Sequence, residues 1–164
     1  MTNQDTTKQA KQLDRQQLEL WVTYLGAHSA VISALEQGMD QDVGLPLSWY
    51  DVLVQLSMAP ERKLRLGELA ESVILTRSGI TRLLDRMVAA GLVRREPAAG
   101  DRRGYFAVLT DEGHEMLTRA APGHSQRAWD CFIQHIKPEE FPALQAVFDR
   151  VLHWQSSQRG PRQD

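Results

Sequence analysis

Residues 65–110, RLGELAESVILTRSGITRLLDRMVAAGLVRREPAAGDRRGYFAVLT, decide the fold of this chain. The stretch divides into a short helix, a turn, a second helix and two runs of strand composition, 91–96 and 105–109. Between these runs, residues 97–104 combine proline, glycine and arginine, which is typical of a hairpin tip. A helix-turn-helix followed by a hairpin is the layout of a winged helix-turn-helix.

The second helix, predicted over 76–90, has one apolar and one polar face. Apolar residues at spacings of three and four predict a buried stripe. Thr76 is the expected N-cap and Gly91 the expected C-cap. The opposite stripe carries the hydroxyl and guanidinium groups that suit a helix in a DNA major groove. The apolar stripe is Ile80, Leu83, Leu84, Met87 and Val88, and the polar one is Ser78, Thr81, Arg82 and Asp85, with Arg77 beside it.

Two short motifs in the hairpin resemble a known family. GLVRR at 91–95 and DRRGYFAVLT at 101–110 resemble the MarR family of bacterial transcription regulators, whose wing carries Asp-x-Arg followed at a fixed distance by Leu-Thr. The resemblance covers about residues 45–115. It implies an obligate homodimer on a pseudo-palindromic site in double-stranded DNA, with its two recognition helices in successive major grooves and wing arginines in the flanking minor grooves.

The resemblance assigns a role to each candidate residue. Arg102 and Arg103 are expected in the minor groove, and Asp101 is expected to hold Arg103 by a charge-assisted hydrogen bond. The expected function is repression of transcription by occupying an operator, relieved by a small-molecule effector. The helix residues expected to read or approach base edges are Arg77, Ser78, Thr81 and Arg82; those expected mainly to contact phosphate or brace the wing are Arg86, Arg94 and Arg95.

The distribution of charge supports a nucleic-acid partner better than the net charge of −2 does. Residues 61–110 hold ten basic and six acidic residues, a net charge of +4, and the rest of the chain carries −6. A basic module on an acidic scaffold orients a protein toward phosphate. A solvated charged surface has the same composition, so charge alone leaves both interpretations open.

The remaining segments predict a mainly α fold with a helical dimerisation region. Residues 45–110 form the winged domain, 12–44 and 111–156 form the dimerisation region, and 1–11 and 157–164 are a disordered and a frayed tail. A long amphipathic helix from Leu13 to about Met39 is too long for so small a domain to cover, so it calls for a partner chain. The apolar set of the last helix is Phe141, Leu144, Val147, Phe148, Val151, Leu152 and Trp154.

Local signals set the expected helix boundaries. Residues 44–46 break the first helix, and Ser48 is the predicted N-cap of a helix that runs to Met58, with Asp51 completing a weak capping box. The helix from Asp111 to His135 is expected to kink or split at residues 122–123. Pro138 is expected to open the last helix at its N1 position.

An aromatic cluster is the candidate effector site. The resemblance implies that a small aromatic or phenolic effector binds between the dimerisation region and the winged domain, where aromatic rings with a few polar tips would suit it. An ordinary aromatic-rich helix interface explains the same residues. The cluster consists of Trp21, Tyr24, His28, Trp49, Tyr50 and Met58.

Other function classes receive less support. A winged-helix adaptor for proteins would more often expose apolar residues on the second helix than arginines and hydroxyls. Cys131 as a redox sensor is the other alternative, but a buried, small apolar residue in a helix, with no basic residue nearby in sequence, is the simpler interpretation. The five histidines lack metal-site spacing. No phosphate loop or nucleophile motif is found, which argues against an enzyme.

Composition predicts a cytoplasmic location for the protein. One cysteine forms no internal disulfide, and the N-terminal residues show no apolar signal-peptide core. No apolar run approaches the ~20 residues that would span a bilayer, so a membrane location is not expected.

Overall fold

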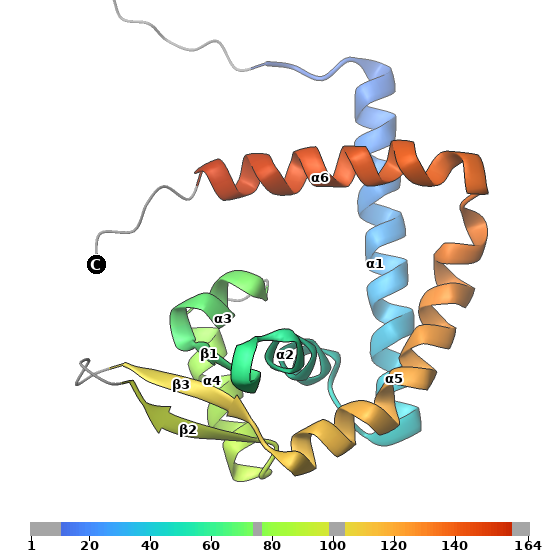
Figure 1. Cartoon of the computed structure of the whole chain (residues 1–164). Coiled ribbons are helices and arrows are strands. Elements are labelled where there is room, and N and C mark those ends of the chain that lie inside the picture. Colours follow the sequence, from blue (N-terminus) through green and yellow to red (C-terminus); the bar gives the residue numbers. More distant parts are fainter. Residues whose placement is uncertain (1–10, 74–76, 99–103, 159–164) are drawn as a thin grey trace, which may run out of the picture.

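The computed structural model describes residues 11–73, 77–98 and 104–158 of the chain. Helices α2, α3 and α4 gather with a small sheet on one side, while α1, α5 and α6 extend away from them (Figure 1). The helices are α1 (Arg15–Val43), α2 (Leu47–Met58), α3 (Leu66–Ser72), α4 (Arg77–Ala89), α5 (Asp111–Cys131) and α6 (Phe141–Gln158). The strands are β1 (Lys63–Arg65), β2 (Val93–Pro97) and β3 (Tyr105–Leu109), and the 3-10 turns are η1 (Pro60–Arg62), η2 (Ile133–His135) and η3 (Pro138–Glu140).

The first two helices are delimited by specific caps. The Asp14 carboxylate accepts a 2.8 Å hydrogen bond from the Gln17 amide at the start of α1, and Gly44 ends the helix in the left-handed conformation at φ 63°. The predicted break at residues 44–46 is confirmed, and the helix continues past Met39 to Val43. The predicted Ser48 cap is wrong, because α2 already begins at Leu47 and the Pro46 carbonyl, not a side chain, accepts the first amides.

The core lies between α2, α3, α4 and the inner face of the sheet. The predicted stripe of α4 is buried at Ile80, Leu83, Leu84 and Met87. Val88 was predicted to belong to it but is 36% exposed. At about 100° of rotation per residue, Val88 lies roughly a quarter turn from the centre of the stripe, so it faces the rim of the core.

The sheet has the order β1-β3-β2 and is antiparallel throughout. The two strands of the hairpin were predicted, and their register pairs Val93 with Leu109 and Pro97 with Tyr105. Strand β1 was missed by the sequence analysis. It has only three residues, and its single apolar one, Leu64, lies between two cations, so no alternating pattern could reveal it.

The C-terminal helices depart from the predicted boundaries. Helix α5 continues through Pro122 without a break, bends along its length (Figure 1) and ends at Cys131 instead of His135. Residues 133–135 form the separate turn η2. Pro138 opens the 3-10 turn η3 and not the helix itself, since α6 begins only at Phe141. Helix α6 reaches Gln158, into the segment predicted to fray.

Helices α1 and α6 leave large apolar side chains exposed. Within the described residues, α6 has extensive contacts only with the preceding turn η3. Contrary to the expectation from sequence, α1 is by length and composition apolar enough to cross a bilayer, a property that helices of water-soluble proteins also have. The exposed side chains include Leu18, Leu20, Trp21, Val22, Tyr24 and Leu25 on α1 and Phe141, Val147, Val151, Leu152 and Trp154 on α6.

Candidate nucleic-acid interface

The exposed face of α4 carries the polar residues that the sequence analysis singled out. Arg82 and Arg86 are exposed and Thr81 is half-buried, on the side of the helix opposite its buried stripe. In the described part of the chain, neither arginine has an acidic partner. Arg77 and Ser78 belong to the first turn of α4, but their side chains lie outside the described structure, as does the predicted cap Thr76.

Much of the positive charge of the winged domain is engaged within the protein. Arg62 pairs with Asp111 at 3.7 Å, and Lys63 pairs with Glu61 at 2.5 Å. In the hairpin, Arg94 pairs with Glu96 and Arg95 with Asp85 of α4. Among the described residues, Arg82 and Arg86 of α4 are therefore cations whose charge no such ion pair offsets, in contrast to these four.

Arg94 and Arg95 lie on opposite faces of the sheet, as adjacent strand residues must. Arg94 stands opposite Val108 on the outer face, where Lys63 and Arg65 lie over the Phe106 ring at 5.5 and 5.3 Å. Arg95 stands opposite Ala107 on the inner face, with its guanidinium 4.6 Å from the centre of the Tyr105 ring. Only Arg95 reaches α4.

The tip of the hairpin lies outside the described residues. Asp101, Arg102 and Arg103, the predicted minor-groove residues, are therefore not placed. The described base of the hairpin is closed by a 3.0 Å hydrogen bond from the Ala98 amide to the Gly104 carbonyl. This bond brings the two ends of the tip together on the side of the sheet away from α5.

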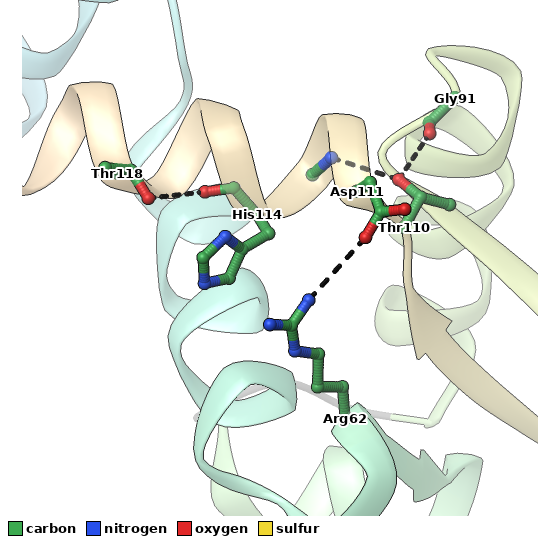
Figure 2. Close-up of polar contacts among 7 residues, drawn as sticks. Arg62, Gly91, Thr110, Asp111, His114 and Thr118 are labelled. Atoms are coloured by element: carbon green, nitrogen blue, oxygen red, sulfur yellow. Dashed lines mark hydrogen bonds and ion pairs between the residues drawn. The ribbon is translucent and has the colours of Figure 1, made fainter.

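Hydrogen bonds connect the end of α4 to the start of α5 (Figure 2). The Thr110 hydroxyl donates to the Gly91 carbonyl at 2.7 Å and accepts from the Gly113 amide at 3.0 Å, as the predicted helix cap. Gly91, the predicted C-cap of α4, has φ 76°. Asp111 at the start of α5 also receives Arg62. Thr110 thus binds a backbone group at the end of α4 and another at the start of α5.

The aromatic candidates for an effector site fall into two groups within one chain. Trp21, Tyr24 and His28 form an exposed ladder along α1, with ring centroids 5.7 and 6.0 Å apart. Tyr50 of α2 is buried, and its ring lies tilted by 32° against the ring of His124 of α5, with the ring centroids 4.3 Å apart. The other two candidates are half-buried Trp49 and Met58, which is 79% exposed at the end of α2.

His124 was not singled out by the sequence, which offered only a lone histidine after Pro122 and Gly123. Burial lowers the pKa of His124, and nearby Asp51 opposes this shift. Loss of solvent raises the pKa of Asp51, although its side chain keeps an exposed edge, and burial also raises the pKa of Tyr50. The His124 Nδ1 atom is buried without a hydrogen-bond partner among the described residues.

The remaining candidates show no sign of metal or redox chemistry in the described residues. Cys131 is a free, half-buried thiol at the last residue of α5 and packs against the core. The described residues contain no group of three or more His, Cys, Asp or Glu side chains arranged to hold a metal ion.

A model of the MarR family matches residues 43–104. The HTH-type transcriptional regulator PecS of Dickeya dadantii is 33% identical over 85 residues, which are 52% of this chain and 51% of PecS. The chain thus spans about half the length of the curated relatives it matches. The relatives found are transcriptional regulators and not enzymes, in agreement with the expectation from sequence.

Solved structures extend the similarity to nearly the whole chain. Sco3205, a MarR family transcriptional regulator from Streptomyces coelicolor whose crystal structure is in complex with DNA, is 34% identical, with a TM-score of 0.83 over 88% of this chain and 90% of its own. AbsC, a regulator of the same family and organism, is 30% identical, with a TM-score of 0.82 over 90% and 99% of the two chains. The predicted mainly α, winged helix-turn-helix fold is confirmed.

Proposed function

Since the chain belongs to the MarR family of transcriptional regulators, we propose that it binds a pseudo-palindromic operator in double-stranded DNA as a homodimer. It acts in the cytoplasm as a repressor. Residues 45–110 form its DNA-binding domain, and residues 12–44 with 111–156 form its dimerisation region.

The observation that carries the proposal is the exposed face of α4. A recognition helix is held by its apolar side and presents small, hydroxyl and cationic side chains to the base edges. Thr81 and Arg82 lie on that side, and Arg86 flanks it. Sco3205, which is 34% identical and whose crystal structure is in complex with DNA, supports DNA binding by this chain.

The proposed homodimer rests on the unpartnered helices. Helix α6 has little support within its own chain, and apolar side chains such as Val151 and Trp154 are exposed along it. Exposed apolar area of this kind is stabilised when a second copy covers it. Two copies related by a two-fold axis present two α4 helices, which suits half-sites about one helical turn apart.

We further propose that a small aromatic or phenolic effector releases the DNA. The supporting feature is the contact of Tyr50 in α2 with His124 in α5, because it joins the winged domain to the long helices. A ligand that wedges beside half-buried Trp49 would change this contact and the spacing of the two α4 helices. The probe is 4-hydroxybenzoate added to the DNA complex. Release by the parent and resistance of Trp49→Ala support this role, and resistance of the parent contradicts it for this class of ligand.

The DNA-binding proposal is tested by selection from random duplexes, followed by variants. Arg82→Ala is expected to relax base preference at one position of each half-site, at about 1–3 kcal/mol of discrimination. Arg15→Ala is the matched control, because it removes the same charge at the far end of α1. Enrichment of no sequence, or an Arg82→Ala variant with the parent's preference, would favour a protein adaptor or a different docking.

A further inference from the structure

We propose that Arg95 is a positioning residue that fixes the wing relative to the recognition helix through Asp85, and that it does not itself contact DNA. The inference rests on the proposed function of DNA binding. The expectation from sequence was that Arg95, like Arg86 and Arg94, contacts phosphate or braces the wing; the inference selects the second role and names the residues that perform it.

The geometry joins three elements at one side chain. Arg95 belongs to β2, its guanidinium pairs with the Asp85 carboxylate of α4, and it lies 4.6 Å from the centre of the Tyr105 ring of β3. A guanidinium over an aromatic face is attracted by the ring electrons while its edge stays free for a carboxylate. The two contacts therefore hold one side chain between the helix and both strands of the hairpin.

The position of Asp85 along α4 places the ion pair with Arg95 next to the helix face that is proposed to contact DNA. Asp85 follows Arg82 by three residues, so the two lie on neighbouring positions of one helical face. The hairpin tip begins just beyond Pro97, two residues after Arg95 on the same strand. The link between Asp85 and Arg95 thus fixes the angle between α4 and the described part of the β2–β3 hairpin.

The neighbouring Arg94 provides an internal contrast. It has the same charge on the same strand, but it lies on the outer face and pairs with Glu96 of its own strand. Its ion pair links no second element. A loss that is specific to Arg95 would therefore reflect the bridge and not the loss of one positive charge from β2.

Electrostatics alone and the bridge predict opposite effects for Asp85→Ala. Removing a carboxylate from a helix that faces phosphates should strengthen DNA binding if only charge matters. If Asp85 holds Arg95, the same substitution releases the wing. We expect operator affinity to fall about three- to fivefold, the size of one partly exposed ion pair.

The experiment measures the full-length variants Asp85→Ala, Arg95→Ala, the double variant, Arg95→Lys and Arg94→Ala in two ways. Amide hydrogen exchange of β2 and β3 is followed in the free protein, and operator affinity is followed against salt concentration. Asp85→Ala should accelerate hairpin exchange. Arg95→Ala, which also loses the Tyr105 contact, should accelerate it at least as much, and the double variant should match Arg95→Ala, while Arg94→Ala leaves exchange at the parent rate. Arg95→Lys should restore part of the protection.

The operator measurements separate a positioning role of Arg95 from a direct phosphate contact. Arg95→Ala should weaken binding without changing the salt slope, whereas a lost phosphate contact lowers the slope by about 1. Tighter binding by Asp85→Ala, a reduced slope in Arg95→Ala, or parent-like exchange in both would overturn the inference. If the parent bound no duplex, the proposed function would fail, and hairpin exchange would still decide whether the bridge exists.

Discussion

Gly113→Ala tests the close contact between α5 and the residues that follow α4. A Cβ at position 113 would lie 2.1 Å from the Leu92 carbonyl oxygen and 2.8 Å from Leu109 Cδ1, where ordinary contacts begin at 3.4 Å. The Leu92 oxygen is backbone and also accepts the Thr110 amide at 3.3 Å, so it has no freedom to rotate away. Helix α5 must move by about 1 Å or more.

The expected magnitude follows from two opposing effects. Overpacking of a close contact costs about 1–3 kcal/mol and disturbance of the Thr110 cap about 1 kcal/mol. Alanine in place of glycine within a helix recovers up to about 1 kcal/mol. We expect a net loss of about 1–3 kcal/mol in the free energy of unfolding, and a lower thermal midpoint by roughly 2–12 °C for a chain of this size.

Thermal unfolding followed by circular dichroism at fixed protein concentration measures this loss. The matched control is Gly123→Ala in the same helix, whose Cβ would meet only the Asp42 carboxylate at 2.8 Å, a side chain that can turn aside. The control should stay within about 1 kcal/mol of the parent. A Gly113→Ala protein as stable as the control would refute the close contact between α5 and the end of α4.

Three further predictions concern other contacts. His124→Phe should flatten the pH dependence of stability. Because burial lowers the pKa of His124, the unfolded chain takes up a proton at a higher pH than the folded chain, and the parent loses stability as pH falls below about 6.5. Chemical denaturation of both proteins between pH 8 and 5 measures this difference. Gly38→Ala should destabilise the parent, because its Cβ would lie 1.8 Å from Arg127 Nε and displace the ion pair of Arg127 with Asp42. In an Arg127→Ala background the same substitution should leave the free energy of unfolding unchanged. An equal loss of unfolding free energy in both backgrounds would contradict this prediction. Glu61→Asn should raise the thermal midpoint, because Glu61 has φ 52° and asparagine tolerates the left-handed region better; a lower midpoint would assign more weight to the ion pair of Glu61 with Lys63.

The sequence predicted the elements that repeat a strong local pattern. The stripe of α4, the Gly91 cap, the Thr110 cap and the hairpin each depend on a few neighbouring residues. The structure confirms them, except that Val88 of the stripe is exposed. The Ser48 cap was wrong because Pro46 fixes the backbone and starts α2 earlier. Strand β1 was missed because its pairing with β3 is set by tertiary contacts and not by its own three residues.

The candidate site was less accessible to sequence reasoning. Composition counted Arg62 in the positive charge of the winged domain and assigned Arg94 and Arg95 to phosphate contacts or bracing of the wing, but it gave no partner for any of the three. Their pairing with acidic residues near them in space, such as Asp111 and Asp85, depends on the fold. The contact between Tyr50 and His124 joins α2 to α5, which lie far apart in the sequence. No periodic pattern of residues predicts such a contact.

Sequence-specific binding of DNA by this chain is tested most directly by fluorescence polarisation of the purified protein against its selected duplex and a scrambled duplex over a series of salt concentrations. We predict tight binding to the selected duplex, two half-sites about one helical turn apart, and affinity that falls steeply as salt rises. Equal, weak binding to both duplexes at every salt concentration would contradict the proposed regulator.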